Sequence, residues 1–254
     1  MLTNNKIKFI KSLEHKKYRK QHACYVVEGE KMVLELLQSK YSLLELYITD
    51  AFMQKHPALI PTQPVPVKVD EKTLKKASHL QTATQALALV AIKDGEILLP
   101  KANELALALD HIQDPGNLGT IIRSALWFGI KTIYCSIDTV DVYNPKVVQA
   151  TMGALFRVNV VYTDLDRLIE QAKKEHLPLI GTRLDGTNLY QEKLPNGGII
   201  LMGNESKGLS VNLSQHLDFS LLIPSFPAET RQMESLNVSV ATALVLAEFR
   251  RQQI

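Results

Sequence analysis

Cysteine, tryptophan and long apolar runs are scarce in this sequence of 254 residues, and the shortages exclude several classes of protein. The two cysteines, Cys24 and Cys135, lie far apart in the chain. They match neither a disulfide framework nor the paired spacing of a zinc site, so we expect a reducing, cytoplasmic environment and no metal. The N-terminus has no apolar signal core, and no apolar run reaches the roughly 20 residues of a membrane-spanning helix, so we expect no membrane partner.

Two frequent nucleotide-binding motifs are also missing. No expected strand is followed by Gly-x-Gly-x-x-Gly, which argues against a Rossmann-type dinucleotide site. The segment Gly203-Asn-Glu-Ser-Lys-Gly208 has the glycine spacing of a phosphate loop, but Leu209-Ser210 stands where that loop requires Lys-Ser or Lys-Thr. A buried strand that runs into a glycine-rich turn is typical of a ligand-binding turn or of an ordinary strand-to-helix loop.

The remaining composition is that of an ordinary globular protein, with 46% hydrophobic and 22% charged residues. The net charge of +3 is small, but residues 1–20 carry seven Lys or Arg against one acid, Glu14. Ile7, Ile10 and Leu13 follow helical spacing within residues 4–21. This segment is therefore either a solvated helix with a basic face or a helix that binds nucleic-acid phosphates.

Residues 1–95 predict a small α/β domain with its own core. After the basic helix, the pattern predicts strands at 24–29, 43–49, 65–69 and 86–92, with helices at 30–38 and 71–78. Asp94-Gly95 and Leu99-Pro-Lys-Ala-Asn103 are typical of turns and linkers. We therefore predict a first domain at 1–95, a linker at 96–103 and a second domain at 104–254.

The second domain alternates regularly between strand and helix. Strands are predicted at 105–110, 132–136, 157–162, 178–183, 198–202 and 219–224, and helices at 118–128, 144–155, 164–175, 210–215 and 236–250. Such alternation predicts a mostly parallel sheet covered on both faces. Asn117 can cap the first of these helices, and Ser235 or Asn237 the last. Trp127 and Phe128 are expected in the core.

Three polar segments interrupt this pattern: Asp114-Pro-Gly-Asn-Leu-Gly-Thr-Ile-Ile-Arg123, the turn Gly203–Gly208, and Ile223-Pro224 through Ser235-Leu-Asn-Val-Ser-Val-Ala241. Arg123 lies in an otherwise apolar helix, where an unpaired buried cation would be costly. His111 precedes the first segment and is an alternative candidate for a base. Each segment by itself has a structural explanation, but the three in this order are specific.

The three segments resemble the three motifs of the SpoU (TrmH) family of RNA ribose 2′-O-methyltransferases, within the SPOUT class. The resemblance covers residues 105–250. Tyr25-Val-Val-Glu-Gly29 and the basic helix before it are similar to the small RNA-binding domain of longer members. This similarity favours the phosphate-binding interpretation of the basic helix, and it indicates RNA contacts at Lys16, Lys17, Arg19, Lys20 and Arg123.

The resemblance implies a C-terminal trefoil knot, S-adenosylmethionine as methyl donor, and a homodimer in which a second subunit completes the site. The implied catalytic residues are Asn117, Arg123, Glu205, Ser235 and Asn237. Contacts to the methyl donor are implied for Thr182, Leu201, Met202, Gly203, Asn204, Gly208, Ile223, Ser235 and Leu236. We expect Glu205 to orient Arg123 or a backbone amide, and Arg123 to clamp a phosphate and stabilise the forming alkoxide.

The expected function is therefore 2′-O-methylation of a ribose in structured RNA, with ribosomal RNA of the 23S type favoured over transfer RNA. The alternatives are a transfer-RNA ribose methyltransferase, a base methyltransferase of a related knotted family, and a non-catalytic RNA-binding protein on the same fold. One departure from the family is the segment Ser225–Glu234, which is longer than usual and contains no glycine. Roles for Ser225 or Met233 do not follow from the resemblance.

Overall fold

The computed structural model describes residues 2–82, 84–93, 95–226 and 235–254, which form two compact units. The N-terminal unit consists of Met1–Asp94 together with Asp141–Arg157, and the C-terminal unit of Gly95–Val140 and Val158–Ile254. Segment 141–157 thus groups with the N-terminal unit, although its neighbours in sequence are strands of the other unit. Within the described ranges, we find no helix with the length and apolarity needed to cross a bilayer.

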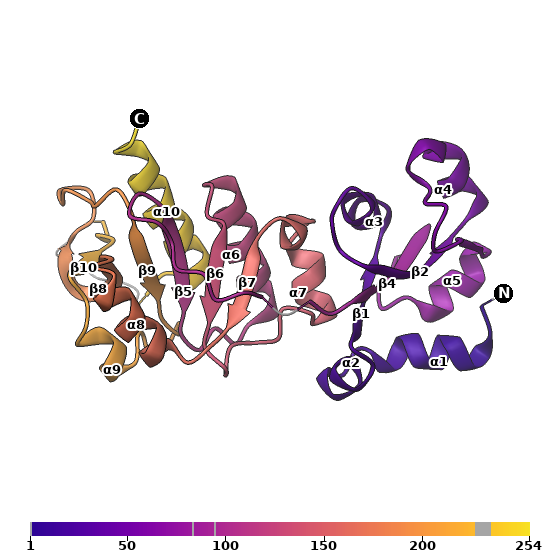
Figure 1. Ribbon diagram of the computed structural model, residues 1–254, viewed down its shortest axis with the longest axis horizontal. Helices are drawn as coiled ribbons and strands as arrows, with labels where there is room; N and C mark the ends of the chain where they lie inside the picture. The colour runs from indigo at the N-terminus through magenta and orange to yellow at the C-terminus, as the bar shows by residue number, and fades with distance from the viewer. Residues whose placement is uncertain (1, 83, 94, 227–234) are drawn as a thin grey trace. The chain divides into compact units, whose positions relative to one another are not determined.

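The N-terminal unit is built on a four-stranded mixed sheet with strand order β1-β4-β2-β3 (Figure 1). Strand β4 runs antiparallel to β1 and β2, whereas β2 and β3 are parallel. The elements of this unit are α1 (Asn4–Ser12), α2 (Lys16–His22), β1 (Cys24–Glu28), α3 (Glu30–Leu37), β2 (Leu43–Ile48), α4 (Asp50–Lys55), β3 (Val67–Lys68), α5 (Glu71–Ala77), β4 (Ala86–Ala91) and α7 (Pro145–Ala150), with 3-10 turns η1 (Pro57–Leu59) and η2 (Ala154–Phe156). The predicted strands are present, and α4 is an additional helix.

The basic segment forms two helices where the spacing predicted one. Helix α1 ends at Ser12, and α2 begins at Lys16. The side chain of Arg19 is 2% exposed and donates through Nη1 to the carbonyl oxygens of Leu13 and Glu14, at 2.8 and 2.7 Å. Its Nε and Nη2 both donate to Oδ2 of Asp141, the former at 3.0 Å. The predicted RNA contact of Arg19 is thus wrong, because its guanidinium is buried in the fold.

The C-terminal unit contains a six-stranded sheet with strand order β10-β8-β9-β5-β6-β7, and every neighbouring pair is parallel. This confirms the predicted parallel sheet. Helices α8 and α9 cover one face, and α6 and α10 cover the other (Figure 1). The elements are β5 (Leu105–Leu109), α6 (Pro115–Trp127), β6 (Thr132–Cys135), β7 (Asn159–Tyr162), α8 (Leu165–Lys174), β8 (Leu179–Asn188), β9 (Gly198–Met202), α9 (Val211–Ser214), β10 (Phe219–Leu222) and α10 (Val238–Arg251).

The strands of this sheet are apolar on both sides because helices bury both faces. In β5 and β9 every residue is buried. Ala106, Ala108, Ile199 and Leu201 pack under α8 and α9 in one core cluster. Since all strands are parallel, their carboxyl ends lie at one edge, and the loops after β5, β8, β9 and β10 leave the sheet there.

The predicted knot would form in the C-terminal part of this unit. Residues 227–234, and with them Met233 and most of the lengthened segment Ser225–Glu234, lie outside the described residues. The knot therefore stays a prediction.

Candidate active site

A chain of side-chain hydrogen bonds joins the three polar segments at the carboxyl edge of the sheet. Asn237 donates from Nδ2 to Oδ1 of Asn117 at 2.9 Å, and Asn117 donates from its own Nδ2 to Oε1 of Glu205. The hydroxyl of Ser235 lies 3.5 Å from the carbonyl oxygen of Glu205. The hydrogen bonds thus run from Asn237 to Asn117 and from Asn117 to Glu205, and each joins residues more than 85 positions apart in the sequence.

The helix caps explain why Asn117 is free to take part. Asp114, not Asn117 as predicted, is the N-cap of α6, and its carboxylate accepts from the backbone N–H of Asn117 at 2.8 Å. Asp at the N-cap with Pro115 at the first helical position is a favourable helix start. Asn237 is the N-cap of α10, as predicted, because its Oδ1 accepts from the N–H groups of Ser239 and Val240. Its Nδ2 remains available for Asn117.

The turn after β9 is closed by Asn204. Two backbone hydrogen bonds pair Asn204 with Gly208, at 3.0 and 2.8 Å, and Oδ1 of Asn204 accepts from the N–H groups of Ser206 and Lys207. Gly208 has a φ of +68°, a backbone conformation that glycine adopts without strain. Nδ2 of Asn204 donates to the carbonyl oxygen of His111 at 2.9 Å. The side chain of Asn204 therefore holds the turn against the loop after β5.

His111 has a left-handed backbone conformation with a φ of 58°, which is uncommon for a side-chain-bearing residue. Its ring lies between two carboxylates: Nδ1 is 2.9 Å from Asp110 and Nε2 is 3.3 Å from Asp138. Both ring nitrogens thus lie beside carboxylates, and the alternative role of His111 as a base stays a prediction.

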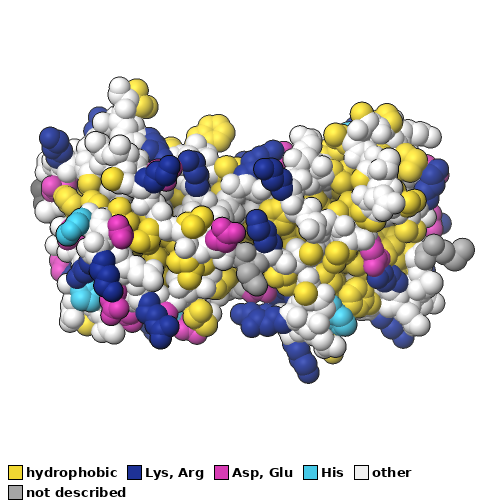
Figure 2. Space-filling view, viewed as in Figure 1, with side chains coloured by type: hydrophobic (Ala, Val, Ile, Leu, Met, Phe, Trp, Pro, Cys, Tyr) yellow, Lys and Arg dark blue, Asp and Glu magenta, His cyan; other side chains and the backbone are white. Residues whose placement is uncertain are grey.

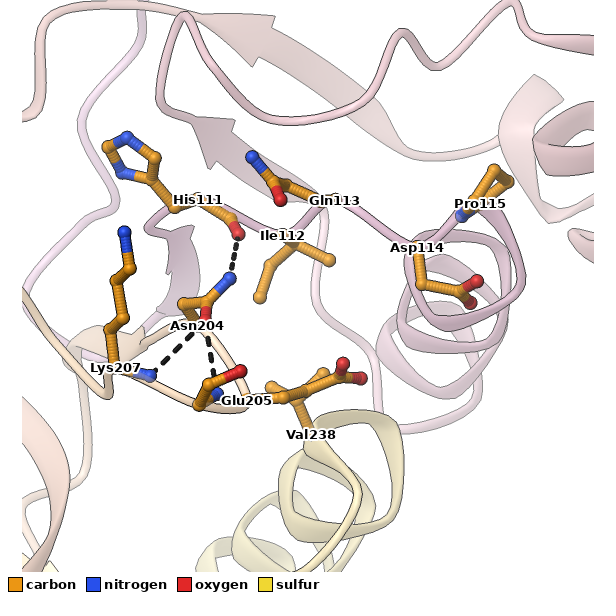
Figure 3. Close-up of a pocket in the computed structure, with 10 residues that line it drawn as sticks. His111, Ile112, Gln113, Asp114, Pro115, Asn204, Glu205, Lys207 and Val238 are labelled. Carbon is orange, nitrogen blue, oxygen red and sulfur yellow. Dashed lines mark hydrogen bonds between the residues drawn. The ribbon is translucent and has the colours of Figure 1, made fainter.

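A cavity of about 430 Å³ lies beside the contact between the three segments. Its lining comes from residues 111–115 after β5, residues 204–207 of the turn after β9, and Val238 of α10 (Figure 3). His111, Gln113 and Lys207 lie on one side, and the carboxylates of Asp114 and Glu205 lie on the other. The cavity thus lies at the carboxyl edge of the sheet, with the ammonium group of Lys207 on one side and two carboxylates on the other.

Arg123 differs from the sequence-based expectation in two respects. Its side chain is exposed, so Arg123 is not the costly buried cation that the apolar helix suggested. Among the described residues, Arg123 has no hydrogen-bond or ion-pair partner, and Glu205 bonds to Asn117 rather than to Arg123. The guanidinium is consequently free within one chain to contact RNA or a second subunit.

The residues implied for the methyl donor come from several places: Thr182 lies within β8, Leu201 and Met202 end β9, Gly203 and Ile223 follow β9 and β10, and Leu236 precedes α10. Thr182, Gly203 and Ile223 are half-buried, and Leu236 is 48% exposed. A Cβ at Gly203 would lie 2.2 Å from the backbone carbon of Gly208, so glycine is required there by the closed turn itself. The side chains of Leu201 and Met202 are buried in the sheet core, where they support the wall from behind.

Neither cysteine is suited to act as a nucleophile. Burial raises the pKa of the Cys135 thiol, and burial is also the main cause of the raised pKa of Cys24. Because the thiolate is the reactive form, both thiols are inert at neutral pH.

Two features escaped the sequence argument. Trp127, expected in the core, is 85% exposed on α6, one helical turn beyond Arg123. Asp114, Gln113 and Lys207 line the cavity without having been singled out. The dipeptide Asp114-Pro115 is an N-cap signal that could have identified the true start of α6.

The predicted basic surface of the N-terminal unit is partly present. Lys16, Lys17 and Lys20 are exposed on α2. Figure 2 shows Lys and Arg side chains projecting from this unit around α2.

Comparisons with known proteins identify the family. Residues 104–247 match the SpoU rRNA Methylase family, and residues 4–88 match the MRM3-like substrate binding domain. The chain belongs to the SpoU rRNA methylase family.

Relatives of known structure share the whole fold. An RNA methyltransferase of the TrmH family from Porphyromonas gingivalis is 34% identical, with a TM-score of 0.87 over 99% of both chains. The AdoMet-bound rRNA methyltransferase from Sinorhizobium meliloti is 27% identical, with a TM-score of 0.88 over 100% of this chain and 97% of the other. The 23S rRNA (guanosine(2553)-2′-O)-methyltransferase RlmP of Bacillus subtilis (strain 168) is 29% identical over 97% of this chain and 96% of its own.

These comparisons confirm the predicted family, the fold class apart from the knot, the RNA 2′-O-methyltransferase activity and S-adenosylmethionine as the cofactor. The predicted roles of individual residues stay predictions.

Proposed function

We propose that this SpoU-family protein transfers a methyl group from S-adenosylmethionine to a ribose 2′-hydroxyl in ribosomal RNA of the 23S type. The observation that carries the proposal is the chain Asn237–Asn117–Glu205, which joins the three motif segments beside one cavity. Ribosomal RNA is favoured because the similarity to RlmP spans both units of the chain, including the unit that matches a substrate-binding domain.

The methyl donor supplies an electrophilic methyl group on a sulfonium, so the protein needs neither a nucleophile of its own nor a metal. Thr182, Gly203, Ile223 and Leu236 would hold the donor, partly through backbone groups, with Gly208 and Ser235 at the edges of the same loops. The tasks left to the side chains are positioning and stabilisation of the charge that develops on the ribose oxygen.

Glu205 and the two asparagines act in positioning. The carboxylate of Glu205 has one oxygen bonded to Asn117, and the other is free to accept from a hydroxyl. Arg123 is a poor base, because a guanidinium group is not deprotonated in proteins. We therefore infer that Arg123 clamps a phosphate and stabilises the alkoxide, and that the proton leaves to water or to a phosphate.

We infer a homodimer that forms through the exposed face of α6 and α10. These helices lie side by side and run in the same direction, since Asn117 contacts Asn237 at one end and Arg250 donates to the carbonyl of Phe128 at the other. Trp127 is 85% exposed and Val240 is 48% exposed on this pair. Of these, Trp127 is the side chain whose burial by a second copy would remove the most apolar surface from water. A second copy that covers them would also receive the free Arg123.

The remaining elements of the proposal concern the domains. We infer an RNA-binding domain at 1–95 with Lys16, Lys17 and Lys20 as phosphate contacts, a linker at 96–103, and a knotted methyltransferase domain at 104–254. Buried, unpaired thiols at Cys24 and Cys135 are consistent with a cytoplasmic protein.

The decisive experiment maps ribose methylation in RNA from cells with and without this protein. Loss of one 2′-O-methyl group in 23S-type RNA, restored in vitro by the purified protein and S-adenosylmethionine, is the expected result. A site lost from transfer RNA would instead support the transfer-RNA enzyme. Failure to bind S-adenosylmethionine in a calorimetric titration would contradict any methyltransferase activity.

A further inference from the structure

The cavity beside the active site is lined by a lysine, Lys207, whose ammonium group takes no part in the hydrogen bonds between the three motifs. On its acidic side, Asp114 and Glu205 each bond to Asn117 through one carboxylate oxygen. On the opposite side, the ammonium group of Lys207 and the amide of Gln113 form no hydrogen bond with any described residue. The ring of His111 is already engaged by Asp110 and Asp138.

Lys207 is held in place by its backbone. Its N–H donates to Oδ1 of Asn204 at 3.2 Å, and the turn is closed by the two backbone bonds between Asn204 and Gly208. The same Asn204 donates to the carbonyl of His111, which holds the turn against the loop after β5. A lysine on a fixed turn is therefore presented to the cavity with its ammonium unpaired, as Figure 3 shows.

The cavity suits a ligand with an anion at one end and hydroxyls at the other. Its volume of about 430 Å³ falls in the range of roughly 300–1,000 Å³ that is typical of small-molecule pockets. An unpaired ammonium attracts a phosphate as a point charge. On the other side, the carboxylates of Asp114 and Glu205 offer acceptors for hydroxyl groups. A ribonucleotide has both features at the required ends.

We propose that this cavity is the binding site of the target ribonucleotide, and that Lys207 binds a phosphate next to the ribose that is methylated. This inference rests on the proposed function. The 2′-hydroxyl then lies on the side of Asn117 and Glu205. Lys207 contributes to RNA binding and takes no part in proton transfer.

The test compares wild-type protein with Lys207→Gln, which removes the charge, and Lys207→Arg, which keeps it. Lys174→Gln is the matched control, because Lys174 is an exposed lysine of α8 in the same unit. Ribosomal RNA from cells that lack the protein is the substrate. Methyl transfer is measured as kcat and KM at several salt concentrations, S-adenosylmethionine affinity is measured by calorimetry, and folding is measured as Tm.

We expect Lys207→Gln to raise the KM for RNA about tenfold and to lower the slope of log KM against log salt by about one, as loss of one phosphate contact requires. Its kcat, its affinity for S-adenosylmethionine and its Tm should stay within error of wild type. Lys207→Arg should restore most of the RNA affinity, and Lys174→Gln should behave as wild type.

An unchanged KM and salt slope for Lys207→Gln, with an active wild type, would overturn this inference and leave the proposed function intact. A parallel loss of S-adenosylmethionine affinity or of Tm would also overturn it, because Lys207 would then be maintaining the turn. A wild-type protein that binds S-adenosylmethionine but methylates no RNA would overturn the proposed function and the inference together.

Discussion

The ion pair between Arg19 and Asp141 should determine much of the stability of the N-terminal unit. Arg19 is 2% exposed and Asp141 is 16% exposed, and both Nε and Nη2 of the guanidinium donate to the same carboxylate oxygen. Replacing Asp141 by Asn keeps the shape of the side chain but leaves a buried cation without its counter-charge. Breaking a buried pair in this way costs about 3–5 kcal/mol.

That cost predicts a large and measurable shift. In a unit of this size, about 1 kcal/mol corresponds to roughly 4 °C, so Asp141→Asn should lower the Tm of the N-terminal unit by about 12 °C or more. Thermal and urea unfolding followed by circular dichroism measure the effect. Asp50→Asn is the control, since the Asp50–Lys68 pair of the same unit is 70% and 61% exposed and should contribute less than about 1 kcal/mol.

The reasoning would be refuted if Asp141→Asn and Arg19→Met each changed the free energy of unfolding by less than about 1 kcal/mol, as pairs at the surface do. The double variant Arg19→Met/Asp141→Leu provides a second check. It should be more stable than either single variant, because removal of both charges leaves no buried charge unpaired. If Arg19 instead bound RNA, its substitution would weaken RNA binding without lowering the Tm.

Four further outcomes are expected. Asn117→Asp places a carboxylate against Glu205 and removes a charge-assisted hydrogen bond worth about 1.5–3 kcal/mol, so kcat/KM for methyl transfer should fall about ten- to hundredfold; unchanged transfer would contradict the positioning role. Arg123→Lys keeps the charge but loses the guanidinium fork, so methyl transfer should fall at least about tenfold, and near-full activity would disprove the clamp. Trp127→Glu should convert the dimer to monomer in sedimentation experiments, whereas Val65→Glu, at an exposed residue of the N-terminal unit, should not; a dimeric Trp127→Glu would exclude this face as the interface. Arg251 hydrogen-bonds the buried Glu248 and lowers its pKa from the usual 4.5, so this carboxylate stabilises the fold above pH 4.5 and loses that contribution as the pH falls through the lowered pKa. Glu248→Gln should therefore destabilise the fold more at pH 6 than at pH 3, and an equal difference at both pH values would contradict the assignment.

The sheet of the C-terminal unit could be predicted because its strands are short apolar runs between turn signals. Strands β5, β6 and β9 occur within one residue of their predicted bounds. Periodicity could not show that the predicted basic helix ends at Ser12, because it carries no information on tertiary contacts such as that of Arg19 with an aspartate 122 positions away. Nor could it show that segment 141–157 packs with the N-terminal unit.

The sequence predicted which residues form the site, but not which of them hydrogen-bond to each other. Motif resemblance identified Asn117, Glu205 and Asn237, and the structure brings them together. The partner of Glu205 was expected to be Arg123 or a backbone amide, whereas its carboxylate accepts from the side chain of Asn117, which sequence spacing cannot show. The environment of Trp127 was wrongly predicted because an apolar side chain on an amphipathic helix usually faces the core of its own chain.

The grouping of segment 141–157 with the N-terminal unit has a consequence for protein engineering. Its apolar side chains Val147, Val148, Leu155 and Phe156 are all buried, and Phe156 makes a ring contact with Tyr41. The chain therefore passes between the two units three times, at 94/95, 140/141 and 157/158. A truncated enzyme that begins at residue 104 would strip these side chains of their partners. A functional graft of a new RNA-binding module onto this scaffold would have to replace segment 141–157 together with the first 94 residues.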